Sequence, residues 1–257
     1  MVATAHADVS AVILAAGKGT RMGSELAKVL HPLAGRPLIA HVLETCRTLG
    51  VGQMVVVVGW QREAVEAAVQ PWQPRCVLQD RQLGTGHAVR VTEAAVEGAT
   101  VLVLCGDCPM IPPQLLDELL SRHRASGAAC TGIAARMRDP SGYGRMITDA
   151  QGRLSRIVEH KDATPEQRAI TLVNSGIYAF RREALYRCLA AVTANNTQGE
   201  YYLTDVVGML AAGGEGVELV VTDDVASVLG VNTPADLAQA ERLYAQRRGA
   251  NGAPAGA

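Results

Sequence analysis

Short hydrophobic runs alternate with amphipathic segments along the first half of the chain. The runs are rich in valine, isoleucine and leucine, which predicts buried strands at residues 9–14, 54–58, 76–78 and 100–104. Between them, hydrophobic residues recur at helical spacing, which predicts helices at 37–49, 63–69, 86–96 and 113–124. Continuous hydrophobic strands separated by helices indicate a mostly parallel sheet covered on both faces, a doubly wound α/β fold.

The pattern changes after Gly127. Residues 130–180 contain more β-branched residues and turn signals, which predicts a smaller, partly antiparallel extension that carries an acceptor pocket. Helical spacing returns at 182–191 and 202–210, a strand is predicted at 217–221, and a last helix ends at Arg247. The glycine-, alanine- and proline-rich residues 248–257 predict a flexible tail.

Composition narrows the class of protein. Of 257 residues, 48% are hydrophobic and 19% are charged, a balance typical of a globular chain. Lysine and arginine number 24 against 25 acidic residues, so the basic excess typical of nucleic-acid or anionic-membrane binders is missing. No hydrophobic run is long enough to span a bilayer, and no basic segment precedes the first run at 9–16 as in a signal peptide. We therefore expect a cytoplasmic protein that binds neither nucleic acid nor membrane.

One CxxC occurs among the six cysteines, formed by Cys105 and Cys108. A lone pair of thiols lacks the further ligands of a tetrahedral zinc site. A thioredoxin-like redox pair opens a helix, whereas Pro109 and Pro112 follow here, which disfavours redox chemistry. The sequence therefore predicts reduced thiols without a disulfide framework.

A glycine-rich loop follows the first predicted strand, with the sequence Leu14-Ala15-Ala16-Gly17-Lys18-Gly19-Thr20-Arg21-Met22. Small residues let the backbone approach a ligand, and consecutive amides can surround a phosphate. The loop is neither a P-loop nor G-x-G-x-x-G, because the next glycine, Gly23, comes one position late. Taken alone, the loop is equally compatible with a plain strand-to-helix turn.

Two cations accompany this loop, Arg21 within it and Lys28 shortly after it. Cations beside a phosphate cradle suit a triphosphate whose α-phosphorus is attacked, because one can hold the departing pyrophosphate and the other can stabilise charge at the reacting phosphorus. The alternative interpretation is two solvated surface side chains.

Several segments of the chain resemble those of a known family. Residues 12–22, Lys28-Val29-Leu30 and Leu33-Ala34-Gly35 resemble the opening signature of sugar-phosphate nucleotidyltransferases. Further segments occur in the order found in the uridylyltransferase domain of bacterial bifunctional N-acetylglucosamine-1-phosphate uridyltransferases. These are Leu78-Gln79, Gln82-Leu83-Gly84-Thr85-Gly86-His87-Ala88, Gly106-Asp107, Gly142-Tyr143-Gly144-Arg145, Ile157-Val158-Glu159-His160-Lys161-Asp162, Asn174-Ser175-Gly176, residues 198–205 and Gly230-Val231-Asn232. The resemblance extends over residues 9–247.

The resemblance implies a three-layer, Rossmann-like nucleotide-diphospho-sugar transferase fold. The nucleotide-binding half would be 9–127, the mainly sugar-binding half 128–232 and the C-terminal helix 233–247. The implied activity is the Mg²⁺-dependent reaction of UTP with N-acetylglucosamine 1-phosphate, giving UDP-N-acetylglucosamine and pyrophosphate for cell-wall precursor synthesis. Because the attacking phosphate is already an anion, no general base is required, and His31, His87 and His160 are assigned no catalytic work.

The resemblance also implies a role for each site residue. The nucleotide would contact Leu14, Ala15, Ala16, Gly17, Gln79, Gly84, Thr85 and Gly106, and the sugar would contact Gly144, Glu159, Asn174, Tyr202 and Thr204. Arg21, Lys28 and Asp107 would be catalytic, with Asp107 and Asn232 holding Mg²⁺, which prefers few protein oxygens plus phosphates and water. The plainer alternatives are a turn-forming Asp107, an Asn232 that caps the last helix and a solvated charged turn at 159–162.

The sequence departs from the family in two ways. Cys105 stands where many relatives carry tyrosine, and the chain contains no hexapeptide repeat of the β-helical acetyltransferase domain. The chain is thus either a truncation or a stand-alone enzyme, for which we expect a monomer or weak homo-oligomer. Rival functions are the same reaction on another sugar 1-phosphate or pyrimidine triphosphate, a dinucleotide-dependent oxidoreductase, and a silent sugar-nucleotide sensor. The late Gly23 disfavours the oxidoreductase, and the intact set of Arg21, Lys28, Asp107 and Asn232 disfavours the sensor.

Overall fold

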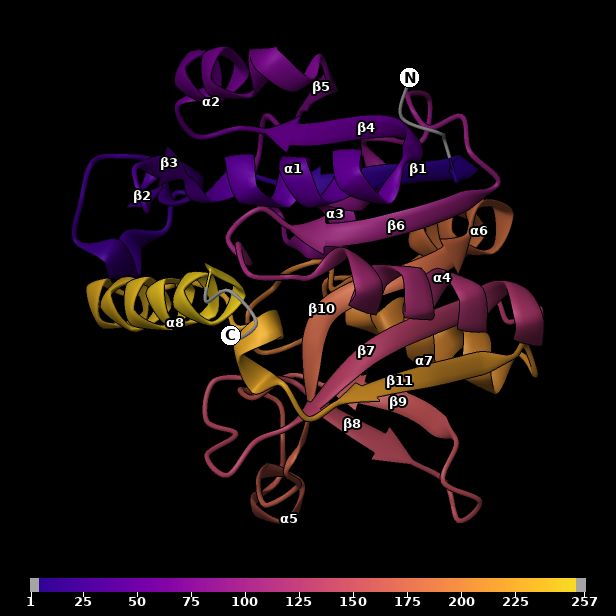
Figure 1. Ribbon diagram of the computed structural model, residues 1–257. Helices are drawn as coiled ribbons and strands as arrows, with labels where there is room; N and C mark the ends of the chain where they lie inside the picture. The colour runs from indigo at the N-terminus through magenta and orange to yellow at the C-terminus, as the bar shows by residue number, and fades with distance from the viewer. Residues whose placement is uncertain (1–4, 253–257) are drawn as a thin grey trace, which may run out of the picture.

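A mixed sheet of nine strands forms the centre of the molecule (Figure 1). The computed structural model describes the backbone of residues 5–252 and the side chains of residues 5–248. Seven strands follow the order β11-β7-β10-β6-β1-β4-β5, and β8 and β9 branch from β10. The strands are β1 (His6–Leu14), β4 (Val51–Val58), β5 (Arg75–Leu78), β6 (Thr100–Cys105), β7 (Cys130–Arg136), β8 (Arg145–Thr148), β9 (Leu154–Val158), β10 (Leu172–Arg181) and β11 (Val217–Thr222).

The main path of the sheet is mostly parallel. Strand β10 runs antiparallel to both of its neighbours, β6 and β7. The other neighbours on the path, β11 with β7, β6 with β1, β1 with β4 and β4 with β5, pair in parallel. The predicted fold class is confirmed. The predicted extension is only partly separate, because β7, β10 and β11 belong to the main sheet and only β8 and β9 extend beyond it.

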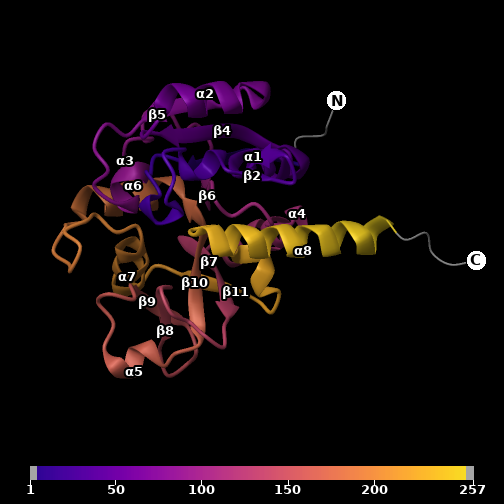
Figure 2. The same ribbon diagram turned by 90° about the vertical axis from the view of Figure 1, so that its left-hand side faces the viewer.

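Helices cover both faces of the sheet because successive strand residues point to opposite sides. In β1, Ala11 and Ile13 enter one buried cluster, whereas Val12 enters the other. The first cluster packs under α1 (Leu38–Leu49), α2 (Arg62–Val69) and α4 (Pro113–Ser126). The second packs under α3 (Thr85–Arg90), α6 (Arg182–Ala191) and α7 (Thr204–Ala212). Figure 2 shows the three layers edge-on, with α3, α6 and α7 on the side opposite α1 and α4.

The C-terminal helix α8 (Pro234–Gly252) lies across the ends of the strands (Figure 2). It packs against the hairpin of β2 (Pro32–Leu33) and β3 (Arg36–Pro37), which follows the 3₁₀ turns η1 (Thr20–Met22) and η2 (Lys28–Leu30). A small hydrophobic cluster joins Ala240 of α8 to Met22 and Leu33. The end of the chain is thereby fixed to the segment that carries Arg21 and Lys28.

The remaining short elements lie between or beside the strands. These are η3 (Gln70–Trp72), η4 (Val225–Val228) and α5 (Pro165–Arg168). Helix α5 begins with a capping box, in which the Thr164 side chain accepts from the Gln167 backbone and the Gln167 side chain accepts from the Thr164 backbone.

Two predicted helix boundaries were wrong. The helix expected at 86–96 ends at Arg90, because the Thr92 hydroxyl donates to the Val89 carbonyl at 2.7 Å and competes with helical bonding. The last helix continues to Gly252, so residues 248–252 of the expected tail are helical. A single glycine such as Gly249 costs only about 1 kcal/mol, which an established helix can absorb. The rest of the expected tail, 253–257, lies outside the described residues.

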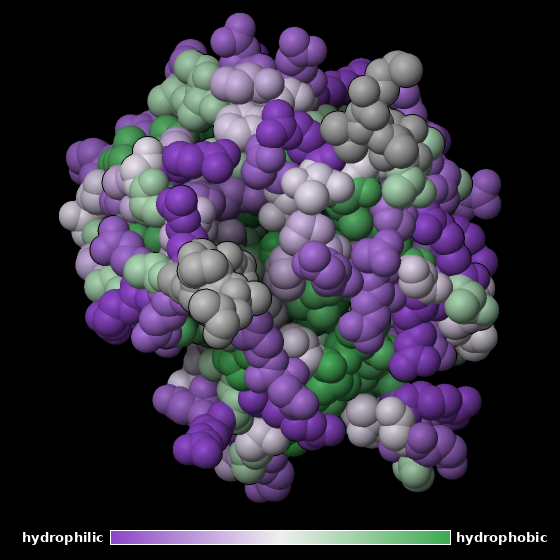
Figure 3. Space-filling model, in the orientation of Figure 1, coloured by the Kyte–Doolittle hydropathy of each residue, from purple (hydrophilic) through white to green (hydrophobic). Residues whose placement is uncertain are grey.

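The surface is mostly hydrophilic. On the face shown in Figure 3, hydrophobic residues appear mainly in the lower half, where Figure 1 draws β7, β9 and β11. Among residues 5–252, no helix combines the length and hydrophobicity needed to cross a bilayer.

Two glycines should respond in opposite ways to substitution by alanine. A Cβ at Gly86 would lie 2.9 Å from the Tyr201 carbonyl oxygen, which already accepts the Gly86 N–H at 2.7 Å. Gly86→Ala should therefore lower the free energy of unfolding by about 1–3 kcal/mol through overpacking. A Cβ at Gly208, inside α7, would make only an ordinary 3.5 Å contact. Gly208→Ala should therefore raise the free energy of unfolding by about 0.5–1 kcal/mol. Urea denaturation of both variants tests this, and equal effects would contradict the described packing.

Candidate active site

A cleft of about 280 Å³ opens at the carboxyl ends of β1, β5 and β6. Ligands bind at this edge in open α/β sheets. The cleft brings together nine of the predicted site residues: Leu14, Ala15, Ala16, Gly17, Lys28, Gln79, Gly84, Thr85 and Asp107. It is also lined by Val29, Gln82, Ala88, Cys105 and Glu200, which the sequence reasoning did not select. Gln82 and Ala88 stand inside the motif that contains Gly84, so the motif itself could have identified them.

A larger surface depression of about 920 Å³ lies elsewhere, around Arg181 and Arg187. Both guanidinium groups bind the Glu215 carboxylate. None of the predicted site residues lines this depression. It is therefore a surface with paired charges, and the chemistry predicted from the sequence belongs to the smaller cleft.

The glycine-rich loop is held against the end of β4. The Ala15 N–H donates to the Val57 carbonyl at 2.9 Å, and the Ala16 carbonyl accepts from Trp60 N–H at 3.0 Å. A Cβ at Gly17 would meet no atom within 4 Å, so this part of the loop faces open space. The backbone there is fixed but uncovered, as a phosphate-binding loop requires.

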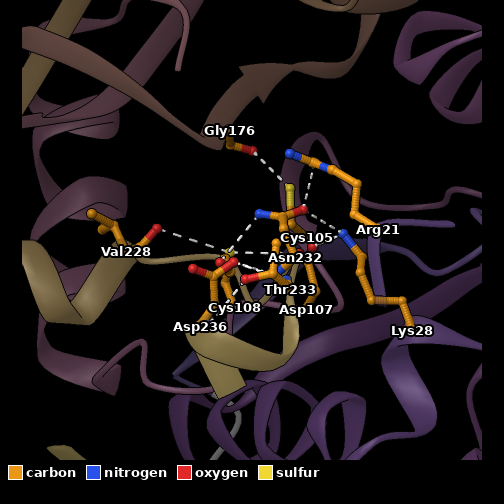
Figure 4. Close-up of polar contacts among 11 residues, drawn as sticks. Arg21, Lys28, Cys105, Asp107, Cys108, Gly176, Val228, Asn232, Thr233 and Asp236 are labelled. Atoms are coloured by element: carbon orange, nitrogen blue, oxygen red, sulfur yellow. Dashed lines mark hydrogen bonds and ion pairs between the residues drawn. The ribbon is translucent and has the colours of Figure 1, made fainter. Parts of the chain in front are cut away.

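Lys28 bridges the loop and the end of β6. Its ammonium contacts Asp107 Oδ2 and donates to Asn232 Oδ1 at 2.9 Å (Figure 4). Only 19% of the Lys28 side chain and 12% of the Asp107 side chain are exposed. Burial lowers the pKa of Lys28, but the charge and hydrogen bond of Asp107 outweigh it, so the pKa is raised above 10.5. Lys28 is therefore a buried, permanently charged cation.

Glycine at position 19 makes this placement of Lys28 possible. Gly19 has a φ of 68°, and a Cβ there would lie 2.5 Å from the Cβ of Lys28. The stem of Lys28 is thus closely fitted against the loop. Lys18, by contrast, places its ammonium 4.3 Å from the centre of the Trp60 ring.

Asn232 supplies the second oxygen at this point. Its Oδ1 accepts from Lys28 and from Arg21 Nη2, the latter at 3.0 Å (Figure 4). Thus Arg21, which does not line the cleft, still joins the same cluster. The oxygens of Asp107 and Asn232 converge on one ammonium, so these residues form a pair of hard donors around a cation position. That arrangement fits the ligand preference of Mg²⁺.

The N-terminus of α8 explains how Asn232 reaches the cluster. Thr233 Oγ1 accepts from Asp236 N–H at 3.1 Å, and Asp236 Oδ2 accepts from the N–H groups of Asn232 and Thr233. This is a capping box centred on Thr233. The alternative that Asn232 caps the helix was wrong, because Thr233 does so and leaves the Asn232 side chain free to face Lys28.

The Gln79 side chain is buried and held in one orientation. Its Nε2 donates to the Gly84 carbonyl at 3.1 Å and to His87 Nδ1 at 3.0 Å. Burial and, next, the positive charge of Arg90 lower the pKa of His87, which favours the neutral ring. Because the amide nitrogen of Gln79 can only donate, His87 Nδ1 is the acceptor in this contact. Both Nε2 hydrogens are thereby used, and Oε1 remains for a ligand in the cleft.

The loop around Gly84 is bound to the segment before α7. Tyr201 N–H donates to the Leu83 carbonyl at 2.8 Å, and Leu203 N–H donates to Thr85 Oγ1 at 3.1 Å. A Cβ at Gly84, where φ is 107°, would lie 2.6 Å from the Tyr201 carbonyl oxygen. The Thr85 hydroxyl therefore has a structural partner, and the loop cannot move independently of residues 201–203.

The predicted sugar-binding residues form a second group beside the cleft. Thr204 Oγ1 donates to Glu159 Oε1 at 3.0 Å, and the Gly144 carbonyl accepts from Asn174 N–H at 2.9 Å. A Cβ at Gly144 would lie 3.5 Å from Glu159 Oε2, so these four residues adjoin. Tyr202 neighbours them in sequence, but its hydroxyl is directed to Asp162 Oδ2 at 3.2 Å. Glu159 is half-buried, which excludes a fully solvated charged turn.

Asn174 and Gly176 connect this group to the cleft. Asn174 Oδ1 accepts from Gly176 N–H at 3.1 Å, and the Gly176 carbonyl lies 3.9 Å from the Cys105 sulfur. Gly106, next to Cys105, is buried beneath the cleft, where its N–H donates to the Leu14 carbonyl at 3.0 Å. A Cβ at Gly106 would lie 2.9 Å from that oxygen, so glycine is required there.

Comparison with known proteins shows the family to which the chain belongs. The family model of the MobA-like NTP transferase domain matches residues 11–203. The bifunctional protein GlmU of Pelobacter propionicus is 47% identical over 243 residues, covering 93% of this chain and 53% of that protein. GlmU of Desulfotalea psychrophila is 45% identical over 239 residues, covering 92% of this chain and 70% of that protein. The chain thus spans between about half and about two thirds of the length of these relatives.

Two solved structures share the fold. A UDP-glucose pyrophosphorylase complexed with UDP-glucose has a TM-score of 0.77 and 18% identity, covering 93% of this chain and 98% of that one. A CMP:2-keto-3-deoxy-manno-octonic acid synthetase complexed with CTP has a TM-score of 0.72 and 23% identity, covering 93% and 99%. At these identities the likeness establishes the nucleotide-sugar transferase fold.

Glu159 should make stability depend on pH. Burial raises its pKa above the ordinary 4.5, so as pH rises the unfolded state ionises first and the free energy of unfolding falls until the folded pKa is passed. Glu159→Gln lacks this loss and should therefore gain stability relative to wild type between pH 4 and pH 7. Hydrogen bonds with its own backbone and the Thr164 hydroxyl lower the pKa of exposed Glu166, so Glu166→Gln should change in the opposite direction. Urea denaturation at both pH values measures this, and the same sign for both variants would refute it.

Proposed function

Because the chain belongs to the family of MobA-like NTP transferase domains, we propose that it is a Mg²⁺-dependent uridylyltransferase. Its proposed substrates are UTP and N-acetylglucosamine 1-phosphate, and its products are UDP-N-acetylglucosamine and pyrophosphate. The observation that carries this proposal is the shared cleft, where the glycine-rich loop, the base-facing Gln79 and the cluster of Lys28, Asp107 and Asn232 meet. The GlmU relatives support a uridylyl substrate.

The reaction needs placement of charge and no proton transfer. An oxygen of the sugar phosphate forms a bond to the α-phosphorus of UTP, and the bond from that phosphorus to the bridging oxygen of pyrophosphate breaks. Pyrophosphate leaves with the electron pair. The attacking oxygen is already anionic, so no base is needed. Mg²⁺ held by Asp107 and Asn232 would neutralise phosphate charge during this exchange.

Lys28 has two possible anionic partners in this scheme. Its ammonium now occupies the meeting point of the Asp107 and Asn232 oxygens. A divalent ion held by Asp107 would compete with Lys28 for this carboxylate, which would release the ammonium toward the nucleotide. The nearest new partner is then the nucleotide phosphate above the glycine-rich loop. Lys28 is the residue that stabilises charge at the α-phosphorus, and Arg21, on the far side of Asn232, holds the departing pyrophosphate.

The orientation of Gln79 accounts for the choice of base. With Nε2 held by Gly84 and His87, Gln79 offers only Oε1 to the ligand. The N3–H of uracil donates to such an acceptor, whereas N3 of cytosine has no hydrogen. The sugar would occupy the adjoining group of Gly144, Glu159, Asn174, Tyr202 and Thr204, where a half-buried carboxylate and a hydroxyl can bind sugar hydroxyls.

Activity should require the metal-facing carboxylate. Among pyrimidine triphosphates and sugar 1-phosphates, pyrophosphate release should be fastest with UTP and N-acetylglucosamine 1-phosphate in Mg²⁺, and EDTA should abolish it. Asp107→Ala should remove most of kcat while the circular-dichroism spectrum stays unchanged. Asp117→Ala, at an exposed carboxylate bound to His6, is the matched control and should retain wild-type kcat. The absence of pyrophosphate from every triphosphate would rule out the proposed reaction.

Removal of Lys28 should lower kcat and not only nucleotide affinity. A cation that meets the α-phosphate stabilises the transition state more than the bound substrate, so Lys28→Ala should lose a factor of about a hundred or more in kcat. Lys28→Arg should recover little, because the stem is fitted against Gly19 and a planar guanidinium is bulkier than an ammonium. Steady-state kinetics at saturating sugar phosphate measure both variants. A change confined to the KM for UTP, or full recovery with arginine, would make Lys28 a binding residue.

Loss of the His87 acceptor should reduce base selectivity. In His87→Leu the Gln79 amide can rotate, and the ratio of kcat/KM for UTP to that for CTP should fall about tenfold, the value of one hydrogen bond of about 1–1.5 kcal/mol. His87→Asn is the matched variant, because its Oδ1 can replace Nδ1 as acceptor, and it should retain most of the ratio. Equal selectivity in wild type and His87→Leu would mean that His87 does not orient Gln79.

A further inference from the structure

Two thiols stand on either side of Asp107. Cys105 ends β6, and the turn that follows is closed by a hydrogen bond from Cys108 N–H to the Cys105 carbonyl at 3.1 Å. The two sulfurs and a carboxylate oxygen of Asp107 all lie within 4.8 Å of one another (Figure 4). Two thiols alone are too few ligands for a tetrahedral metal site, so the sequence predicts none at this CxxC. The fold supplies the third ligand from between them.

Among the described residues, the recorded partners of the two thiols outside the pair are distant. Cys105 Sγ lies 3.9 Å from the Gly176 carbonyl oxygen, and Cys108 Sγ lies 4.0 Å from that of Val228. The closer contact is from Cys108 Sγ to Asp107 Oδ1, at 3.7 Å. Sulfur is a weak donor, so these long contacts contribute little to holding the thiols in place.

From this cluster we propose a binding site for a thiophilic divalent cation, of the Zn²⁺ or Cd²⁺ type, formed by Cys105 Sγ, Cys108 Sγ and Asp107 Oδ1. Around tetrahedral zinc, bonds of about 2.3 Å to sulfur and about 2.1 Å to oxygen place the two ligand atoms about 3.6 Å apart. The 3.7 Å between Cys108 Sγ and Asp107 Oδ1 matches that separation, and Cys105 Sγ, within 4.8 Å of the other ligand atoms, approaches it. Three protein ligands leave a fourth position open to water.

The two carboxylate oxygens of Asp107 have different neighbours. Lys28 contacts Oδ2, whereas Cys108 contacts Oδ1. The thiophilic cation therefore binds on the side of the carboxylate that Lys28 leaves open. On binding, each thiol gives its proton to solvent and becomes a thiolate ligand. With two thiolates and one carboxylate around a divalent cation, the occupied site has a net charge of −1, which the Lys28 ammonium balances.

Occupation of this site has a consequence for catalysis that rests on the proposed function. With Asp107 tied to the thiophilic cation and Lys28 kept at Oδ2, neither residue is available to the nucleotide. The site is thus inhibitory. Mg²⁺ does not compete well for it, because hard cations prefer oxygen over thiolate ligands.

Titration of the free protein with Cd²⁺ tests the site without any nucleotide. Thiolate-to-cadmium charge transfer absorbs in the near ultraviolet, so wild type should gain this band with one equivalent of Cd²⁺. Cys105→Ser and Cys108→Ser should each lose about half of the band and bind Cd²⁺ about a hundredfold or more weakly, and Asp107→Asn should keep the band but bind more weakly. Cys76→Ser, at a half-buried cysteine of β5 outside the cluster, is the matched control and should behave like wild type.

Besides the absence of the band from wild type, two results would overturn the site. One is an unchanged Cd²⁺ affinity in Cys105→Ser, a variant at a half-buried position whose fold is checked by its circular-dichroism spectrum. The other is a band in wild type that Cys76→Ser removes. Because the titration uses no substrate, a failure of the proposed transferase reaction leaves its outcome unaffected. Conversely, an active transferase without the band would refute the cation site alone.

Discussion

The buried ion pair between Lys28 and Asp107 is the interaction on which the arrangement of the cleft depends. It joins the 3₁₀ turn after the glycine-rich loop to the end of β6, and Asn232 adds the start of α8 to the same point. Removal of one partner of such a pair leaves an uncompensated charge in a site of low polarity, which is costly. The loop, the strand end and the helix start are therefore held together by charge before any ligand is present, and a ligand that carries charge of its own must rearrange them.

A second constraint couples the cleft to the group of residues around Glu159 that lies beside it. The loop that carries Gly84 is bonded to residues 201–203, and α7 begins directly afterwards at Thr204, whose hydroxyl binds Glu159. Glycine at 84 and 86 is needed because the Tyr201 carbonyl lies too close for a side chain. A base at Gln79 and a sugar near Glu159, as proposed above, would therefore contact opposite ends of one short, continuous bonded segment.

The sequence predicted the parts of the molecule that local pattern determines. Continuous hydrophobic runs placed β1, β4 and β6, and the parallel arrangement then required Asp107 and the glycine-rich loop to meet at one edge. Prediction from the sequence failed where a contact between distant or unforeseen partners determined where a helix ends or which residue caps it. Thr92 ended α3 early by bonding to the Val89 carbonyl, and Thr233 displaced Asn232 as the cap of α8. The orientation of Gln79 by His87 joins side chains eight residues apart across a turn, so no periodic pattern could indicate it.

The cluster around Asp107 contains ligands of two kinds, and their chemistry decides which cation each can serve. Asp107 and Asn232 offer hard oxygens at the point now filled by Lys28, while Cys105 and Cys108 offer sulfur on the other side of the same carboxylate. Thiolates add nothing to Mg²⁺ binding, so the sulfur atoms do not strengthen the oxygen site. Two divalent cations on one carboxylate repel each other strongly at low polarity. Binding of a cation on one side of the carboxylate would therefore weaken the binding of a second cation on the other side.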